Sequence, residues 1–215
     1  MQEHLSPASE KRTPEAGRRI VREDIEWCDV WIPHLNQDHL PRVLLIGDSI
    51  TRAYYPDVGE RLRDRAFVGR LTTSRSVGDP ALIVEVNSVL GQTSFEVIHF
   101  NNGMHGWGYT EEEYETYFPE FVEAIRSCAP KARLIWASTT PVRVEGNLSE
   151  FDARNERVKV RNACAAHYVQ TQNIPVNDLF SLAAIEHYSP DGVHFNESGA
   201  AIQAEQVAAA ISKEI

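Results

Sequence analysis

The sequence has few cysteines and no group of residues spaced as metal ligands. Only three of its 215 residues are cysteine, and Cys28, Cys128 and Cys164 lie far apart with no C-x-x-C pair. This spacing fits neither a zinc site nor a redox motif, so we expect free thiols that behave as small apolar side chains. We also expect a protein that needs no metal.

A basic patch and a long apolar run are missing as well. The chain has 21 Lys and Arg against 31 Asp and Glu, a formal net charge of -10. Such a charge repels phosphate backbones and anionic lipids, so we expect neither nucleic acid nor a membrane as a partner. The densest basic group is interleaved with glutamates; its members are Lys11, Arg12, Arg18, Arg19 and Arg22. No apolar stretch approaches the roughly 20 residues that span a bilayer.

Length and composition predict one domain with a polar beginning. With 215 residues and 42% hydrophobic content, the chain can bury one core but is short for two ordinary domains. Residues 1–24 predict a polar N-terminal extension on the surface, and residues 25–215 the domain, with the apolar stretch 25–41 anchored on its main body. The chain start lacks the basic and apolar regions of a signal peptide, which favours a cytoplasmic location. The sequence does not indicate an oligomeric state.

From residue 42 onward, short apolar runs alternate with longer amphipathic segments. The runs are too short for helices and do not alternate with polar residues, as expected for strands covered on both faces. They are Val43–Ile46, Ala66–Val68, Val97–Phe100, Leu134–Ala137 and Ile174–Val176. Helices are predicted over 50–65, 80–91, 110–128 and 151–172, and from Asn196 onward. Thr110 followed by three glutamates is a strong helix start. This order predicts a three-layer α/β domain with a five-stranded parallel sheet.

A serine follows the first predicted strand of this sheet. Ligands of such folds bind beyond the carboxyl ends of the strands, where Gly47-Asp48-Ser49 stands. At a strand-to-helix turn the Ser49 hydroxyl would be exposed, and its backbone N–H would lie at a helix N-terminus, suited to a developing oxyanion. For a lone serine at such a turn the commoner role is that of a helix cap, which is the alternative here. A phosphate-binding turn is a further alternative, but neither glycine-rich phosphate motif is present.

An Asp-x-x-His sequence precedes the last predicted helix. A serine hydroxyl needs a base to take its proton, and a histidine base works best when a carboxylate fixes its tautomer. Asp191, three residues before His194 in a tight Pro-Asp-Gly loop, can orient the imidazole locally. A loop-capping aspartate is the alternative. The presence of Ser49 together with this pair favours nucleophilic catalysis.

These two blocks resemble a known family. Val43-Leu44-Leu45-Ile46-Gly47-Asp48-Ser49-Ile50-Thr51 resembles the nucleophile block of SGNH hydrolases, the GDSL-like lipases and acylhydrolases, and Ser189-Pro190-Asp191-Gly192-Val193-His194 resembles their C-terminal block. The resemblance covers residues 42–212. It implies a flavodoxin-like α/β/α domain without metal or organic cofactor, which hydrolyses esters through an acyl-enzyme with Ser49, Asp191 and His194 as catalytic residues.

The resemblance also implies an oxyanion hole. Its donors would be the backbone N–H of Ser49, a backbone N–H of a glycine after the second strand, and a side chain after the third strand. Gly78 is the candidate glycine, although no motif fixes it and a plain turn glycine is an equal alternative. The family's G-x-N-D aligns with Gly103-Met104-His105-Gly106, so His105 stands in place of asparagine. A neutral histidine can donate one N–H. Asn102 and Asn101 are the alternative donors.

Further residues are candidates for contact with a substrate. They are Asp48 beside the nucleophile, Trp107 with Tyr109 as an aromatic wall, and Arg143 after the fourth strand. We expect His99, inside an apolar run, to be a core histidine. The resulting hypothesis is a serine esterase that removes a short acyl group, such as acetyl, from a hydroxylated small molecule or carbohydrate. A lipase, lysophospholipase or thioesterase on the same fold is the first alternative, and a catalytically silent carbohydrate-binding module is the second.

Overall fold

The computed structural model describes residues 18–215, and residues 1–17 of the predicted N-terminal extension lie outside the described residues. A six-stranded sheet has the order β1-β3-β2-β4-β5-β8. Five of these strands are mutually parallel, as predicted: β2 (Arg42–Gly47), β3 (Phe67–Thr73), β4 (Val97–Phe100), β5 (Arg133–Ala137) and β8 (Val176–Asn177). The sixth, β1 (Cys28–Trp31), pairs antiparallel with β3 at the edge. The apolar stretch 25–41 therefore anchors on the body as an edge strand.

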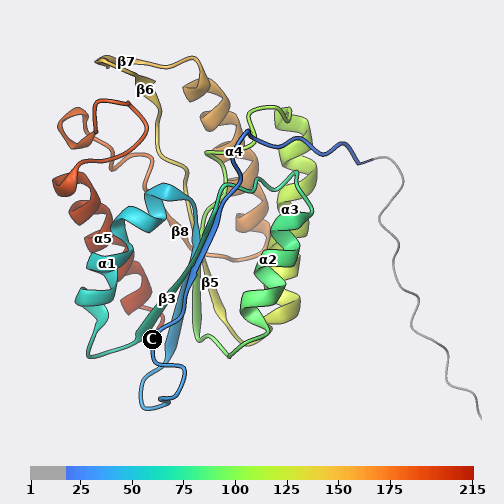
Figure 1. Ribbon diagram of the computed structural model, residues 1–215, viewed down its shortest axis with the longest axis vertical. Helices are drawn as coiled ribbons and strands as arrows, with labels where there is room; N and C mark the ends of the chain where they lie inside the picture. Colours follow the sequence, from blue (N-terminus) through green and yellow to red (C-terminus); the bar gives the residue numbers. More distant parts are fainter. Residues whose placement is uncertain (1–17) are drawn as a thin grey trace, which may run out of the picture.

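Helices cover both faces of the sheet (Figure 1). On one face lie α1 (Ser49–Leu62) and α5 (Glu197–Ser212), and on the other α2 (Ala81–Leu90), α3 (Glu111–Cys128) and α4 (Arg154–Thr171). The side chains of β2 alternate between two cores, because successive residues of a strand point to opposite faces. Val43 and Leu45 pack in the core under α1 and α5, whereas Leu44 and Ile46 pack in the core under α2 and α3. This two-sided burial explains the uninterrupted apolar run.

The predicted helices agree with the structure except at the start of α4. The Thr110 side chain accepts the Glu113 N–H at 3.2 Å and the Glu113 carboxylate accepts the Thr110 N–H at 2.7 Å, which fixes the start of α3. The helix predicted from residue 151 begins instead at Arg154, because the chain before it forms a hairpin of β6 (Arg143–Val144) and β7 (Asn147–Phe151). Gly146, with φ of +73°, allows its tight turn. The strand β7 is mostly exposed and therefore carries no apolar run.

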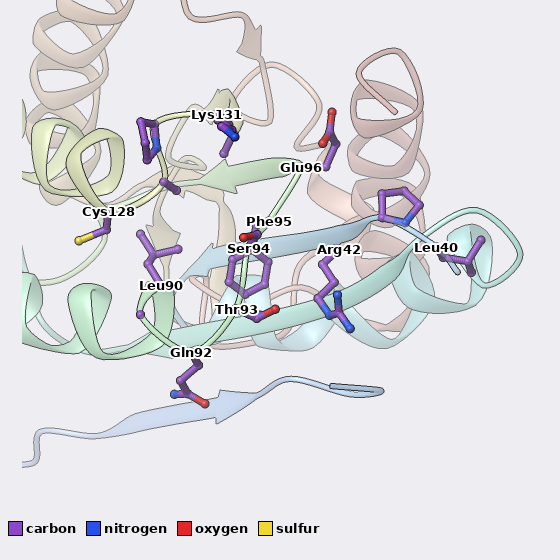
Figure 2. A pocket seen from close by; sticks show the side chains of 15 residues that line it. Leu40, Arg42, Leu90, Gln92, Thr93, Ser94, Phe95, Glu96, Cys128 and Lys131 are labelled. Atoms are coloured by element: carbon purple, nitrogen blue, oxygen red, sulfur yellow. The ribbon is translucent and has the colours of Figure 1, made fainter. Parts of the chain in front are cut away.

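One cavity of the described residues lies away from the candidate site residues. It has a volume of about 600 Å³ and is lined by residues 40–42, 90–96 and 128–132, which lie at the amino ends of β2, β4 and β5 (Figure 2). Ser49, by contrast, follows the carboxyl end of β2. The cavity contains none of the predicted site residues, and parallel-sheet proteins bind their ligands at the other edge.

Candidate active site

Ser49 is the first residue of α1, and its neighbour caps the helix. The Asp48 carboxylate accepts the Ile50 N–H at 2.9 Å. Asp48 is therefore the residue that caps the helix. Because Asp48, predicted as a substrate contact, is only 5% exposed, it offers a substrate little surface. The Ser49 hydroxyl is free of this role, and its Oγ lies 2.8 Å from His194 Nε2. The structure thus brings together two residues that are 145 positions apart in the sequence.

Asp191 orients the imidazole of His194 and shapes the loop that carries it. One carboxylate oxygen lies 2.7 Å from His194 Nδ1, and the other accepts the backbone N–H groups of Val193 and His194 at 2.9 and 2.8 Å. Burial acts to raise the pKa of Asp191, but the hydrogen bonds from His194 and the two N–H groups outweigh it, so the pKa lies below its ordinary value. An ionised carboxylate can only accept, so in the neutral ring Nδ1 carries the hydrogen. The lone pair of Nε2 then faces the Ser49 hydroxyl and can take its proton.

Arg143 binds the loop that carries Asp191 and His194. Its backbone N–H donates to the Gly192 carbonyl at 2.8 Å, and its guanidinium donates to the Leu148 carbonyl at 2.8 Å. The side chain is buried between the rings of Phe151 and Tyr188. The guanidinium of Arg143, predicted as a substrate contact, thus binds the β6–β7 hairpin.

Gly78 lies in the buried loop between β3 and α2, which Asn102 holds in place. A Cβ at Gly78 would lie 2.6 Å from the Tyr109 ring, so only glycine fits without a shift. The Asn102 side-chain oxygen accepts the Val77 N–H at 3.2 Å, and its nitrogen donates to the Arg75 carbonyl at 2.8 Å. Asn102, an alternative oxyanion donor in the sequence analysis, thus fixes the loop that carries Gly78. The Asn101 amide donates to Ala137 and Thr139.

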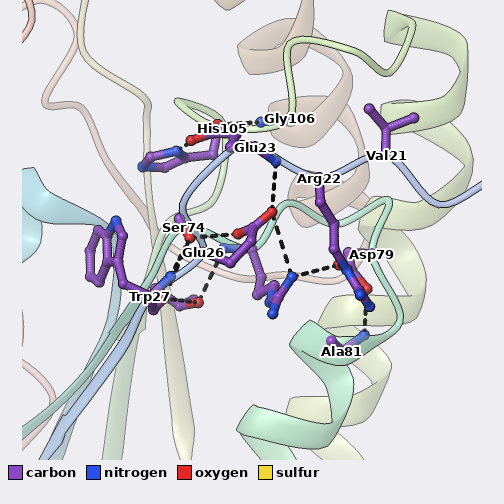
Figure 3. Close-up of polar contacts among 12 residues, drawn as sticks. Val21, Arg22, Glu23, Glu26, Trp27, Ser74, Asp79, Ala81, His105 and Gly106 are labelled. Carbon is purple, nitrogen blue, oxygen red and sulfur yellow. Dashed lines mark hydrogen bonds and ion pairs between the residues drawn. The ribbon is translucent and has the colours of Figure 1, made fainter.

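His105 has a partner that the sequence analysis did not foresee. Its Nδ1 lies 2.9 Å from a carboxylate oxygen of Glu23, and its ring packs edge-on against Trp27 (Figure 3). A neutral imidazole has one N–H, and an ionised Glu23 can only accept it. Nε2 of the neutral ring is then an acceptor, which conflicts with our expectation that a neutral His105 donates to an oxyanion. The contact could not be expected from the sequence, because Glu23 lies 82 residues before His105.

Two arginines of α4 hold the loop that carries His105 and Trp107. Arg161, 1% exposed, donates to the carbonyls of Gly103, His105 and Gly106, and Arg157 donates to those of Trp107 and Tyr109. Both guanidinium groups also bind Glu111. This pair was not predicted from the sequence. A signal existed, because residues four apart share a helix face, but nothing local indicates that this face meets the loop.

The chain before β1 crosses the β3–α2 loop and the loop that carries His105. We call residues 18–27 the clamp segment. Arg18 donates to the carbonyls of Val77 and Gly78. Figure 3 shows that Arg22 binds Asp79, at 2.9 Å, that Glu23 binds His105 and that Glu26 binds Ser74. Residues 18–24, predicted as part of a polar extension, are thus attached to the domain. Trp107, predicted as an aromatic wall, is half-buried and lines a cavity of about 160 Å³ between the clamp segment and the His105 loop.

Within residues 18–215, no group of three His, Cys, Asp or Glu side chains is arranged to hold a metal ion. In that part of the chain no helix combines the length and the apolar character needed to cross a bilayer.

The sequence matches no protein-family model and no curated protein. Solved structures do resemble it. A carbohydrate acetylesterase from Sinorhizobium meliloti is 12% identical over 81% of this chain and 100% of that chain, with a TM-score of 0.67. A GDSL-like lipase from Bacteroides thetaiotaomicron is 16% identical over 81% and 89%, with a TM-score of 0.64. A carbohydrate esterase family 3 protein from Talaromyces cellulolyticus is 19% identical over 81% and 97%, with a TM-score of 0.63. The chain therefore has the α/β/α fold of the GDSL-like lipases, acylhydrolases and carbohydrate esterases, which is the SGNH hydrolase fold.

Proposed function

We propose that this protein is a serine esterase that works through an acyl-enzyme. The observation that carries the proposal is the continuous hydrogen-bonded chain from Ser49 Oγ through His194 to Asp191, with distances of 2.8 and 2.7 Å. A structural cap or a packing contact does not need this order of nucleophile, base and orienting carboxylate. The fold of known ester hydrolases supports the same conclusion.

The reaction follows from the roles of these groups. Ser49 Oγ attacks the ester carbonyl carbon while His194 Nε2 takes the hydroxyl proton, and Asp191 stabilises the resulting imidazolium. The backbone N–H groups of Ser49 and Gly78 are the proposed donors to the oxyanion. The tetrahedral intermediate collapses, the C–O bond to the alcohol breaks, and His194 gives its proton to the leaving alcohol. Water then attacks the acyl carbon while His194 takes its proton. The bond from the acyl carbon to Ser49 Oγ breaks, His194 returns the proton to Oγ, and the acid is released.

A short acyl group, such as acetyl, on a hydroxylated or carbohydrate substrate is the proposed specificity. The side chains of Asp191 and His194 are 45% and 44% exposed, so the site is open to solvent and suits a hydrophilic substrate. Similar structures include proteins described as an acetyl xylan esterase and a carbohydrate acetylesterase. A GDSL-like lipase is also among them, so long-chain esters remain the alternative to test.

Chromogenic esters of increasing acyl length test both parts of the proposal. We expect turnover to be highest with acetate and to fall steeply with longer chains, whereas a lipase would prefer the longer ones. Ser49→Ala should lower kcat by several orders of magnitude with the fold intact, because a hydroxyl at the start of a helix contributes little packing. A purified protein that turns over none of these esters would favour the silent binding module.

A further inference from the structure

The clamp segment contacts the same peptide group that supplies a proposed oxyanion donor. The Val77 carbonyl and the Gly78 N–H belong to one peptide. Arg18 donates from Nη2 to this Val77 carbonyl at 2.8 Å and from Nε to the Gly78 carbonyl at 3.0 Å. We infer that Arg18 is a positioning residue that fixes the Val77–Gly78 peptide with its N–H turned toward the reacting ester. This inference rests on the proposed esterase function.

Peptide geometry gives the direction in which the Gly78 N–H points. The described peptides include no cis bond, and in a planar trans peptide the C=O and N–H point in opposite directions. The Val77 carbonyl points to the clamp segment, so the Gly78 N–H points away from it. This loop follows β3, the parallel neighbour of β2, whose end carries Ser49. The two proposed donors thus come from loops that leave adjacent strands.

The Val77–Gly78 peptide needs an external anchor because one of its residues is glycine. The Tyr109 ring excludes a side chain at position 78, yet glycine leaves the backbone freest to rotate. Asn102 holds the preceding peptide through the Val77 N–H, and Arg18 holds this one and the next. A rotated Val77–Gly78 peptide would point a carbonyl at the oxyanion instead of an N–H.

Arg18 is itself fixed from α3. Its guanidinium lies 3.6 Å from the centre of the Tyr117 ring and 2.8 Å from the Glu120 carboxylate, and its side chain is 19% exposed. A bidentate, stacked guanidinium holds two carbonyls in a defined geometry, which a lysine ammonium cannot reproduce. Hydrogen bonding to the Val77 carbonyl also polarises the peptide and strengthens its N–H as a donor.

The test compares Arg18→Met with Arg19→Met and Arg22→Met. The control arginines anchor the same segment to Glu113 and Asp79 but do not touch the Val77 or Gly78 carbonyl. With a chromogenic acetate ester, Arg18→Met should lose about 10- to 100-fold in kcat with little change in KM, because oxyanion charge develops only in the transition state. Both controls should stay within about threefold of the unmodified protein. Arg18→Lys should recover little of the loss.

A boronic acid that adds to Ser49 provides a second measurement. Its Kd should rise in Arg18→Met by a factor similar to the fall in kcat, and should change little in the controls. Equal losses in all three variants would show that the segment merely docks, and would overturn the inference. Unchanged kcat in Arg18→Met would overturn it as well.

A measurement without turnover separates this inference from the proposed function. Loss of the guanidinium bonds in Arg18→Met should move the carbonyl ¹³C resonance of Val77 and the amide resonance of Gly78 from their positions in the unmodified protein. The control variants should leave both resonances in place. These shifts support the anchoring even if no ester is hydrolysed, in which case only the proposed function fails. Resonances that do not move in Arg18→Met would refute the anchoring even in an active esterase.

Discussion

Replacing Asp191 by asparagine tests the link between the loop and the chemistry of His194. The asparagine oxygen can keep the bonds to the Val193 and His194 N–H groups, so the turn should survive. Its NH₂ group, however, would face His194 Nδ1 and favour the tautomer with the hydrogen on Nε2. That tautomer cannot accept the Ser49 proton.

The expected loss follows from the exposure of the pair. In a buried Ser-His-Asp triad the same change costs about 10⁴ in kcat. Here both side chains are nearly half exposed, so water screens the charge of Asp191 and reduces its support of the imidazolium. We therefore expect a loss of about 10²–10³ in kcat, or roughly 3–4 kcal/mol of transition-state stabilisation.

The assay is kcat and KM on a chromogenic acetate ester, with thermal unfolding as a check of the fold. Asp152→Asn is the matched control, since Asp152 likewise binds a backbone N–H two residues on, that of Arg154 at 2.8 Å, but lies at the start of α4. Its activity should be unchanged. If Asp191→Asn retains activity within about threefold of the unmodified protein, the assigned role of the carboxylate is wrong.

Three further predictions concern pH and the loops around the site. Because hydrogen bonds keep the pKa of Asp191 below its ordinary value, protonation of Asp191 should add nothing to the fall of kcat/KM in mild acid, which should have the slope of one proton; a two-proton slope would contradict this. Burial lowers the pKa of His99 from 6.5 to about 4, so the unfolded chain binds this proton first and stability should fall as pH drops between these values, by up to about 3 kcal/mol. Urea unfolding of His99→Gln should show a smaller loss between neutral pH and about pH 5, and an equal loss would refute the assignment. Asn102→Ala frees the Val77 N–H and should reduce kcat more than KM; if only KM changes, Asn102 does not hold the oxyanion loop.

The sequence predicted those parts of the fold that leave a local pattern. Both faces of β2 are buried, so its apolar run was visible, and Asp191 lies only three residues from His194, so their contact follows from the turn. The β6–β7 hairpin was missed because its exposed strand needs no apolar residues. The roles of Arg18, Glu23 and Arg161 were missed because each depends on a partner more than 50 residues away. Polar residues that bind distant carbonyl groups leave no periodic pattern in the sequence from which their contacts could be predicted.

The clamp segment also has a consequence for the order of folding. It is synthesised before every strand of the parallel sheet, but its hydrogen-bond partners outside the segment lie 46 to 102 residues further along the chain. Closing such loops costs entropy that is recovered only after the partners are in place. During translation the contacts of Arg18 with α3 can therefore form only after α3 has emerged from the ribosome. A ribosome stalled before Glu120 would hold a chain whose nucleophile turn has been made but whose Arg18 still lacks its carboxylate partner.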